Sequence, residues 1–184
     1  MLFRSFRPWI DRIFMMGKSV LLDEFMQRAL DIAATAQNQS GTLPYAAVVV
    51  LDGKIIGEGI NQAPRLFDPT SHGEVEAIKD ACRRLKTTDL SGAAIYTTAE
   101  PCSMCVATMI LTNISKLVYA ADWKDSTSFM SEMAADQPSL KRRYNLVQLR
   151  EQVAKPPEER DMLTERMGQR EAVLIFKSFA NSRK

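Results

Sequence analysis

The chain's only histidine, His72, and a Cys-x-x-Cys pair, Cys102 and Cys105, each stand at the start of a segment with a helical pattern. Residues 72–86 and 102–111 are these two predicted helices. A helix N-terminus carries unpaired N–H groups and the positive end of the helix dipole, so it favours Cys102 as a thiolate. One imidazole and two thiolates can bind zinc tetrahedrally and leave the fourth position for water. The fold must then bring two helix starts together around one metal ion.

Glu74 gives this predicted zinc site an acid–base group. It follows His72 by two residues, on the same first helical turn. A carboxylate there can take a proton from a zinc-bound water and later deliver it to a leaving group. A structural zinc site, which normally has a fourth protein ligand, and a redox-active Cys-x-x-Cys are the alternatives. The third cysteine, Cys82, follows the apolar side of the first helix and is interpreted as a small core residue.

Most of the chain alternates between strand and helix patterns. Apolar, β-branched segments predict four strands, at residues 45–51, 54–60, 93–98 and 115–121. Asp52 and Gly53, between the first two, are a strong hairpin signal. A helix starting near Ser19 precedes the strands, and the two ligand-bearing helices lie between the later ones. Strand, helix, strand, helix, strand is the rhythm of an α/β layered fold, and we expect a fifth strand at residues 144–149.

The remaining segments have weaker patterns. Residues 61–71 are predicted as a loop because prolines interrupt them, and a loop that leads into a metal-ligand helix must pass the site. Residues 122–137 are rich in Ser, Asp and Met and show weak periodicity. Residues 158–168 are predicted as a helix that ends in glycine, and residues 171–180 as a terminal helix.

Length and composition describe an ordinary globular chain. Its 184 residues fit one domain, assigned to residues 17–184, after an N-terminal extension at residues 1–16. The net charge of +2 is too small to indicate a nucleic-acid or membrane partner by itself. Three cysteines without a disulfide pattern favour a reducing compartment, so we expect a cytoplasmic protein. No apolar run is long enough to span a bilayer, and a surface-binding or organelle-targeting segment is the alternative interpretation of residues 1–16.

Two motifs resemble the cytidine deaminase superfamily. They are the run from Asp68 to Ile78, which holds His-x-Glu, and the run from Ala99 to Cys105, which holds Pro-Cys-x-x-Cys. Both are most similar to the guanine deaminase branch and its nucleoside-deaminating relatives. The resemblance implies a three-layer α/β/α fold with a central mixed sheet of about five strands. It also implies a homodimer, one Zn²⁺ per chain held by the three ligands named above, and hydrolytic deamination of a purine such as guanine, to xanthine and ammonia, with Glu74 as the catalytic residue.

The resemblance also assigns substrate contacts. Asn61 stands where guanine deaminase-like sequences carry an asparagine that binds the purine, although a turn residue that caps the preceding strand is the alternative. Tyr45 stands where an aromatic residue packs on the base, with a core tyrosine as the alternative. Gly73 replaces a common alanine, and its N–H can still serve the substrate. Asp125 lies in a stretch that departs from the family pattern, Trp123 to Met130, and could accept hydrogen bonds from a ring N–H and an amino group.

Other functions share these motifs. A tRNA adenosine deaminase carries both, and Lys141, Arg142 and Arg143 could contact RNA, although a charge run is more often a solvated face. Deamination of guanosine, cytosine or a triazine is also found on this scaffold. The other class is a noncatalytic, zinc-scaffolded interaction domain, and Glu74 speaks against it.

Overall fold

The structure, a computed structural model, describes residues 23–137, 140 and 144–183. The chain divides into two compact units, Met1–Lys141 and Arg142–Lys184. The predicted N-terminal extension at residues 1–16 and the predicted helix start at Ser19 lie outside the described residues. Within the described ranges, no helix is both long enough and apolar enough to cross a membrane.

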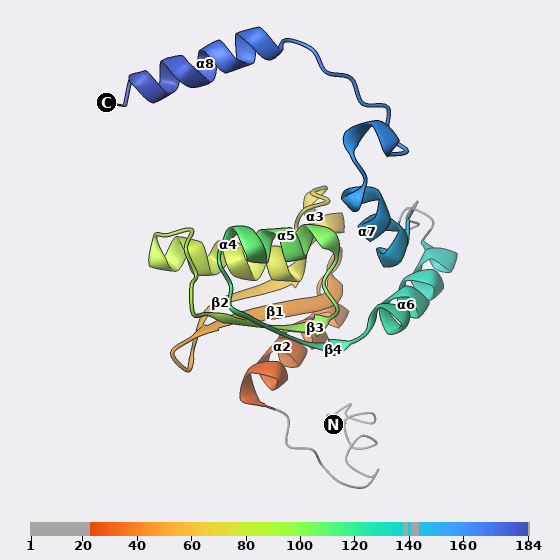
Figure 1. Cartoon of the computed structure of the whole chain (residues 1–184). Coiled ribbons are helices and arrows are strands. Elements are labelled where there is room, and N and C mark those ends of the chain that lie inside the picture. Colours follow the sequence, from red (N-terminus) through yellow and green to blue (C-terminus); the bar gives the residue numbers. More distant parts are fainter. Residues whose placement is uncertain (1–22, 138–139, 141–143, 184) are drawn as a thin grey trace, which may run out of the picture. The chain divides into compact units, whose positions relative to one another are not determined.

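A mixed sheet of four strands forms the centre of the first unit, in the order β2-β1-β3-β4 (Figure 1). The strands are β1 (Leu43–Leu51), β2 (Lys54–Asn61), β3 (Ala94–Ala99) and β4 (Lys116–Ala121). β1 is antiparallel to both β2 and β3, whereas β3 and β4 are parallel. The four strands predicted from the apolar, β-branched segments are therefore confirmed.

The β1–β2 hairpin turns at Asp52 and Gly53, whose φ angles are 50° and 70°. Two consecutive positive φ angles define the tight turn whose twist matches that of the paired strands. Asp and Gly are among the few residues that adopt this conformation readily. The predicted hairpin is confirmed for that reason.

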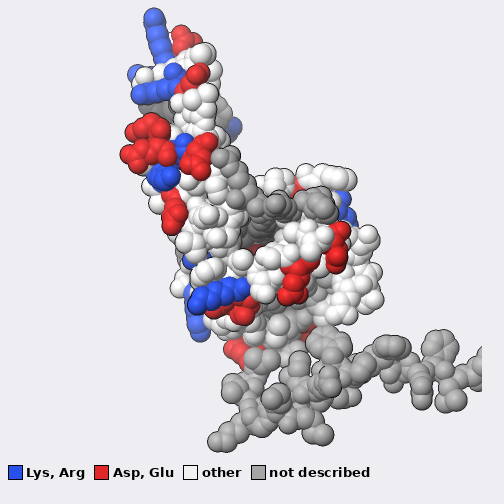
Figure 2. All heavy atoms as spheres, turned by 90° about the vertical axis from the view of Figure 1, so that its right-hand side faces the viewer, with Lys and Arg blue, Asp and Glu red and all other residues white. Residues whose placement is uncertain are grey.

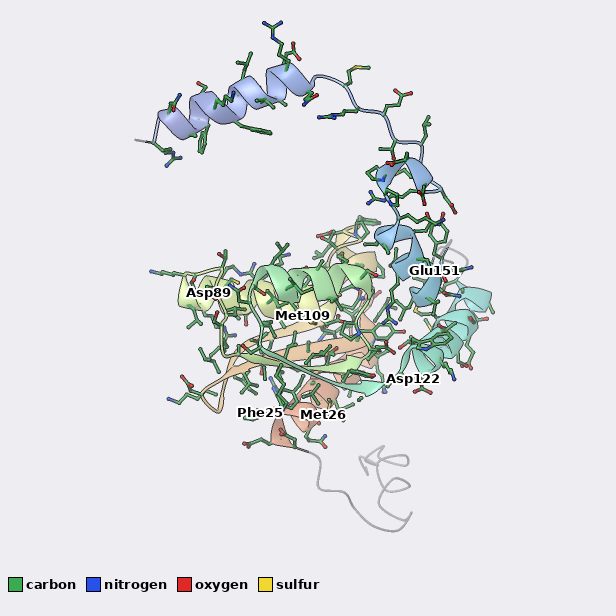
Figure 3. All side chains as sticks on the ribbon, viewed as in Figure 1. Phe25, Met26, Asp89, Met109, Asp122 and Glu151 are labelled. Atoms are coloured by element: carbon green, nitrogen blue, oxygen red, sulfur yellow. The ribbon has the colours of Figure 1, made fainter. Side chains whose placement is uncertain are left out.

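Helices cover both faces of the sheet, as the predicted three-layer fold requires (Figure 1). α2 (Glu24–Ala34), followed by the short helix η1 (Thr35–Asn38), lies on one face, and α4 (Gly73–Leu85) and α5 (Ser103–Leu111) lie on the other. Side chains alternate along a strand, so the central strands contribute to a core on each side. The α2 side buries Met26, Ala29, Val48, Val50 and Tyr96. On the other side the buried apolar residues of the helices include Val75, Ile78, Ala81 and Met109, and Figure 3 labels Met26 and Met109 on opposite sides of the sheet.

Residues 122–137, with their weak periodicity, form α6 (Trp123–Asp136) in the same unit. Asp122 is its N-cap and accepts the N–H groups of Lys124 at 2.7 Å and of Asp125 at 3.0 Å. The Asp125 carboxylate in turn accepts the Asp122 N–H at 3.1 Å. This reciprocal capping box stabilises the start of a helix whose sequence has little amphipathic character.

The predicted fifth strand at residues 144–149 is wrong, because this part of the second unit forms α7 (Leu146–Ala154). The Asn145 side chain accepts the Gln148 N–H at 2.9 Å, and the Gln148 side chain accepts the Asn145 N–H at 3.0 Å. The capping box outweighs the β-branched character of Val147. Its signal, Asn-x-x-Gln before an apolar run, is present in the sequence.

The predicted helix at residues 158–168 is also wrong. Only a short turn of 3₁₀ helix, η3 (Pro157–Glu159), forms there, and irregular chain follows. Met162, Leu163 and Met167 are exposed, so this segment buries no apolar face that could stabilise so short a helix. The predicted terminal helix is confirmed as α8 (Gln169–Asn181), and Gly168 precedes it in a left-handed conformation, with φ of 69°.

Candidate active site

The two predicted metal-ligand segments meet on the side of the sheet covered by α4 and α5. His72 is the N-cap residue of α4, and Cys102 is the N-cap residue of α5. The Nδ1 atom of His72 lies 3.7 Å from the Cys102 sulfur and 3.5 Å from the Cys105 sulfur. The two sulfur atoms are 3.6 Å apart. Among the described residues, these three form the cluster of His, Cys and carboxylate ligands that could hold a metal ion.

The spacing of the three atoms fits zinc. Zn–S bonds of about 2.3 Å and a Zn–N bond of about 2.05 Å at tetrahedral angles separate two sulfurs by about 3.75 Å and a sulfur from the nitrogen by about 3.55 Å. The three observed distances, 3.6, 3.7 and 3.5 Å, lie close to these values. Two sulfurs and one imidazole are also ligands that zinc prefers. The residues present therefore fit one zinc ion with a fourth position that no described residue fills.

Charge at the site is already favourable to a cation. A hydrogen bond with Cys105, assisted by one with His72, lowers the pKa of Cys102 to about 4. The same hydrogen bond between the two sulfurs, together with burial, raises the pKa of Cys105. The pair thus carries one thiolate by itself, and a divalent cation stabilises the second thiolate through its charge.

Glu74 lies in the first turn of α4 and is only 6% exposed. Burial raises the pKa of its carboxyl group, and hydrogen bonds to its own N–H and to Cys105 oppose part of that rise. A carboxyl group with a raised pKa exchanges protons more readily near neutral pH than an ordinary glutamate does. A buried carboxyl group with a raised pKa thus lies in the same helical turn that begins at the metal ligand His72.

A hydrogen bond joins the two ends of the loop of residues 62–71, which includes the short helix α3 (Ala63–Leu66). The Gln62 N–H donates to the Ser71 carbonyl at 2.9 Å, so Asn61 and His72, the residues on either side of the loop, lie near each other. Asn61 is 1% exposed, and its Oδ1 accepts the Ala63 N–H at 3.1 Å. The oxygen thus acts as the turn acceptor that the sequence offered as the alternative to a substrate contact.

The backbone of Gly73 packs closely against the backbone of Tyr45 and Ala46 in β1. A Cβ atom at Gly73 would lie 2.5 Å from the Tyr45 carbonyl oxygen and 2.9 Å from the Ala46 Cα. Any side chain at position 73 would therefore push β1 away from the start of α4. The Tyr45 ring is half-buried and contacts Phe129 of α6, with ring centroids 5.8 Å apart and an interplanar angle of 76°.

Asp125 and Glu100 both form hydrogen bonds at the start of α6. Asp125 is exposed, and its carboxylate accepts the N-cap N–H of α6, as described above. Glu100, which no sequence motif assigns a role of its own, accepts the Trp123 N–H on Oε2 at 3.0 Å. Its position directly before Pro101 and Cys102 is the one sequence feature that indicates a role near the metal ligands. Its hydrogen-bond partner lies on another element, so the sequence alone does not predict the contact.

Comparisons with known proteins agree with this geometry. A profile of the cytidine and deoxycytidylate deaminase zinc-binding region matches residues 20–121. A tRNA-specific adenosine deaminase of Aquifex aeolicus is 39% identical over 129 residues, which is 70% of this chain and 82% of that protein. A guanine deaminase of Bacillus subtilis is 38% identical over 104 residues, which is 56% of this chain and 67% of that protein.

Solved structures show the same two groups of relatives. The structure of the Bacillus subtilis guanine deaminase matches with a TM-score of 0.73 and 30% identity, and covers 86% of this chain and 92% of that one. A structure from a study of tRNA:A34 deaminases matches with a TM-score of 0.51 and 39% identity, and covers 54% of this chain and 71% of that one. The match to the guanine deaminase is therefore the more extensive in structure.

Proposed function

The chain belongs to the cytidine and deoxycytidylate deaminase family, and from that premise we propose that it deaminates guanine or a closely related purine base. It is a zinc-dependent deaminase, with relatives that carry the names of guanine deaminase and of tRNA adenosine deaminase. The observation that supports guanine is the extent of the structural match. Because the first unit ends at Lys141, a match over 86% of the chain includes part of the second unit as well.

We place the substrate pocket beside the zinc ligands, between the start of α4 and the side chains of Asn61, Tyr45 and Phe129, and these walls suit a flat heterocycle. Tyr45 and Phe129 supply aromatic surface, on which a nucleobase packs favourably. Asn61 uses its oxygen in the turn, which leaves its amide group to meet an acceptor on the base. Gly73 is the first residue of α4, so its N–H has no acceptor within the helix and can donate to the base.

The reaction exchanges an amino group for oxygen with water as the second reactant. Zinc, held by His72, Cys102 and Cys105, supplies Lewis-acid activation of that water. The Glu74 carboxylate accepts a proton from the water on one of its Oε atoms as the new C–O bond forms. It delivers this proton to the ring nitrogen beside the reacting carbon, then takes the second proton from the hydroxyl group now bonded to that carbon and delivers it to the amino nitrogen. The C–N bond breaks, ammonia leaves, and the ring carbon becomes a carbonyl.

A tRNA adenosine deaminase is the second candidate, and it rests on the 39% identity to the Aquifex aeolicus protein. Its substrate is a polyanion, which a basic rim should attract. The helix that adjoins the proposed pocket has the opposite character, and Figure 2 turns this side of the molecule toward the reader. From Asp122 to Asp136 it carries one basic residue, Lys124, and four acidic residues: Asp122, Asp125, Glu132 and Asp136. The basic run at residues 141–143 lies outside the described residues.

The test is ammonia release by zinc-loaded full-length protein from a panel of free bases, nucleosides and an anticodon stem-loop. We expect guanine to be the best substrate and Glu74→Gln to lower kcat at least about a thousandfold while zinc stays bound, because the variant lacks the proton carrier. Turnover of the RNA alone would replace guanine with the second candidate. A Glu74→Gln protein with unchanged kcat would overturn the proton-transfer role.

We also infer a homodimer. Apolar side chains on α5 and β4 are exposed in the single chain, at Ile110, Leu111, Leu117 and Tyr119, with exposures from 39% to 80%. Exposed apolar surface of this kind is typical of an interface between protein chains. Equilibrium sedimentation measures the mass in solution. A monomer mass at micromolar concentrations would contradict the inference.

A further inference from the structure

Glu100 joins the zinc-ligand loop, the short segment of residues 100–102 between β3 and α5, to the first residues of α6. It follows β3 and directly precedes Pro101 and Cys102. Its N–H donates to the Ala121 carbonyl at 2.8 Å, and its Oε2 accepts the Trp123 N–H at 3.0 Å. Both partners belong to the junction between β4 and α6, which Figure 3 marks by the label on Asp122. One residue thus contacts this junction through its main chain and its side chain together.

The side-chain bond has a specific place in the helix. The first N–H groups of an α-helix have no partner within it. In α6 the Asp122 carboxylate accepts two of them, those of Lys124 and Asp125. The Trp123 N–H is accepted by Glu100 instead. A carboxylate at a helix N-terminus also interacts favourably with the helix dipole. Glu100 therefore completes the cap of α6 from a different element of the fold.

The placement of α6 matters for the pocket. The helix has no fully buried residue, so few contacts fix it to the sheet. Its contact with the proposed pocket is Phe129, which packs edge-on against Tyr45. A shift at the first turn of α6 would move Phe129 relative to Tyr45, because a helix transmits the orientation of its first turn along its axis.

We propose that Glu100 is a positioning residue that fixes α6, and with it the aromatic wall of Tyr45 and Phe129, relative to the zinc ligands. The part of this inference that concerns substrate rests on the proposed function, whereas the coupling of the two elements does not. Glu100 is not one of the three residues that could hold the metal ion. Its loss should weaken binding of the base and leave the zinc ligands in place.

The first test compares Glu100→Ala with Glu100→Gln, which keeps an acceptor oxygen at the same position. Glu132→Ala is the matched control, since it removes an exposed carboxylate from α6 without touching the junction. The zinc-loaded full chain is measured for zinc content, for kcat and KM with guanine, and for acrylamide quenching of Trp123 in a Trp9→Phe background. We expect Glu100→Ala to raise KM about tenfold, the effect of losing one charge-assisted hydrogen bond, and to increase quenching, with one zinc per chain retained. Glu100→Gln should lie between Glu100→Ala and the parent protein, because it keeps the acceptor and loses the charge, and Glu132→Ala should match the parent.

A second pair of variants tests the hydrogen bond from the donor side. Trp123 is the first residue of α6, a position where proline is well tolerated. Trp123→Pro removes the N–H and keeps the helix, whereas Trp123→Ala removes the same side chain and keeps the N–H. A higher KM for Trp123→Pro than for Trp123→Ala supports the proposal, and these variants replace Glu100→Ala should it fail to fold.

Several outcomes would overturn the proposal. Unchanged KM and quenching in Glu100→Ala would show that α6 is held by other contacts. Loss of zinc in that variant would show that Glu100 acts on the ligand loop instead. If the parent protein does not deaminate guanine, the proposed function fails, but the quenching comparison still decides whether Glu100 fixes α6.

Discussion

The two helices that carry the metal ligands, α4 and α5, begin differently from α6 and α7. His72 and Cys102 at α4 and α5, and Asp122 and Asn145 at α6 and α7, are all N-cap residues with extended backbone, with ψ angles between 154° and 178°. Asp122 and Asn145 take part in complete capping boxes. His72 and Cys102 make no side-chain cap hydrogen bond. The same backbone position thus serves helix stability in one pair and metal binding in the other.

The difference shows where α4 and α5 obtain their stability. A capping side chain is worth about 1 kcal/mol. A bound zinc ion contributes far more to the folded state, since its ligands come together only there. The starts of α4 and α5 should therefore depend on the metal, and the starts of α6 and α7 on their own side chains.

Zinc removal should have the largest effect. We expect chelation, or Cys102→Ser, to lower the thermal midpoint of the full chain by on the order of 10 °C, because a large folding contribution is lost. Amide hydrogen exchange should locate the loss at the starts of α4 and α5 and leave α7 unchanged. Cys82→Ser, at the cysteine outside the site, is the control and should bind zinc normally. Equal loss of protection in α7 would remove the contrast between the two pairs.

Gly73→Ala tests the first residue of α4. Alanine is normally better than glycine in a helix by about 1 kcal/mol. Here we expect a net loss of about 1–3 kcal/mol in urea unfolding, because the added Cβ meets the Tyr45 carbonyl. Ser103→Ala, at the equivalent first residue of α5, should change stability by no more than about 0.5 kcal/mol. A more stable Gly73→Ala protein would show that β1 yields easily at this contact.

Asn145→Ala should remove the cap of α7. The expected loss is about 1 kcal/mol, which corresponds to about fivefold faster amide exchange in the first turn of that helix. Asn145→Asp keeps an acceptor and should exchange like the parent protein. Unchanged exchange in the alanine variant would mean that α7 does not depend on its capping box.

The cap of α6 should respond weakly to pH. Hydrogen bonds to the Asp122 carboxylate, that from the Asp125 N–H first, lower its pKa below the ordinary 3.8. A lowered pKa in the folded state means that the carboxylate stabilises α6 fully above its ordinary pKa. This stabilisation is lost as the pH falls from there through the folded-state pKa. The protection of the Lys124 and Asp125 amides against exchange should stay constant above the ordinary pKa and fall in that acidic range, whereas in Asp122→Asn it should show no such fall. A fall in protection near neutral pH in the parent protein would contradict the assignment.

Local chemistry explains which elements could be predicted. Asp52 and Gly53 specify their turn by themselves, because few other residues adopt two positive φ angles. The fifth strand failed for the opposite reason. Leu146 and Val147 are compatible with a strand, but the two hydrogen bonds between Asn145 and Gln148 stabilise the start of a helix at these residues.

By itself the sequence determined the zinc ligands and their setting at two helix starts, because ligand type, spacing and N-terminal chemistry are properties of a few adjacent residues. Only the tertiary structure decided how the pocket is built around them. It placed Gly73 against Tyr45, used the Asn61 oxygen in a turn, and joined Glu100 to Trp123. The contacts of Gly73 and of Glu100 join residues far apart in the chain, and they depend on how separate elements pack, which no local pattern records. The Asn61 turn is local, but the sequence left it open beside a substrate contact.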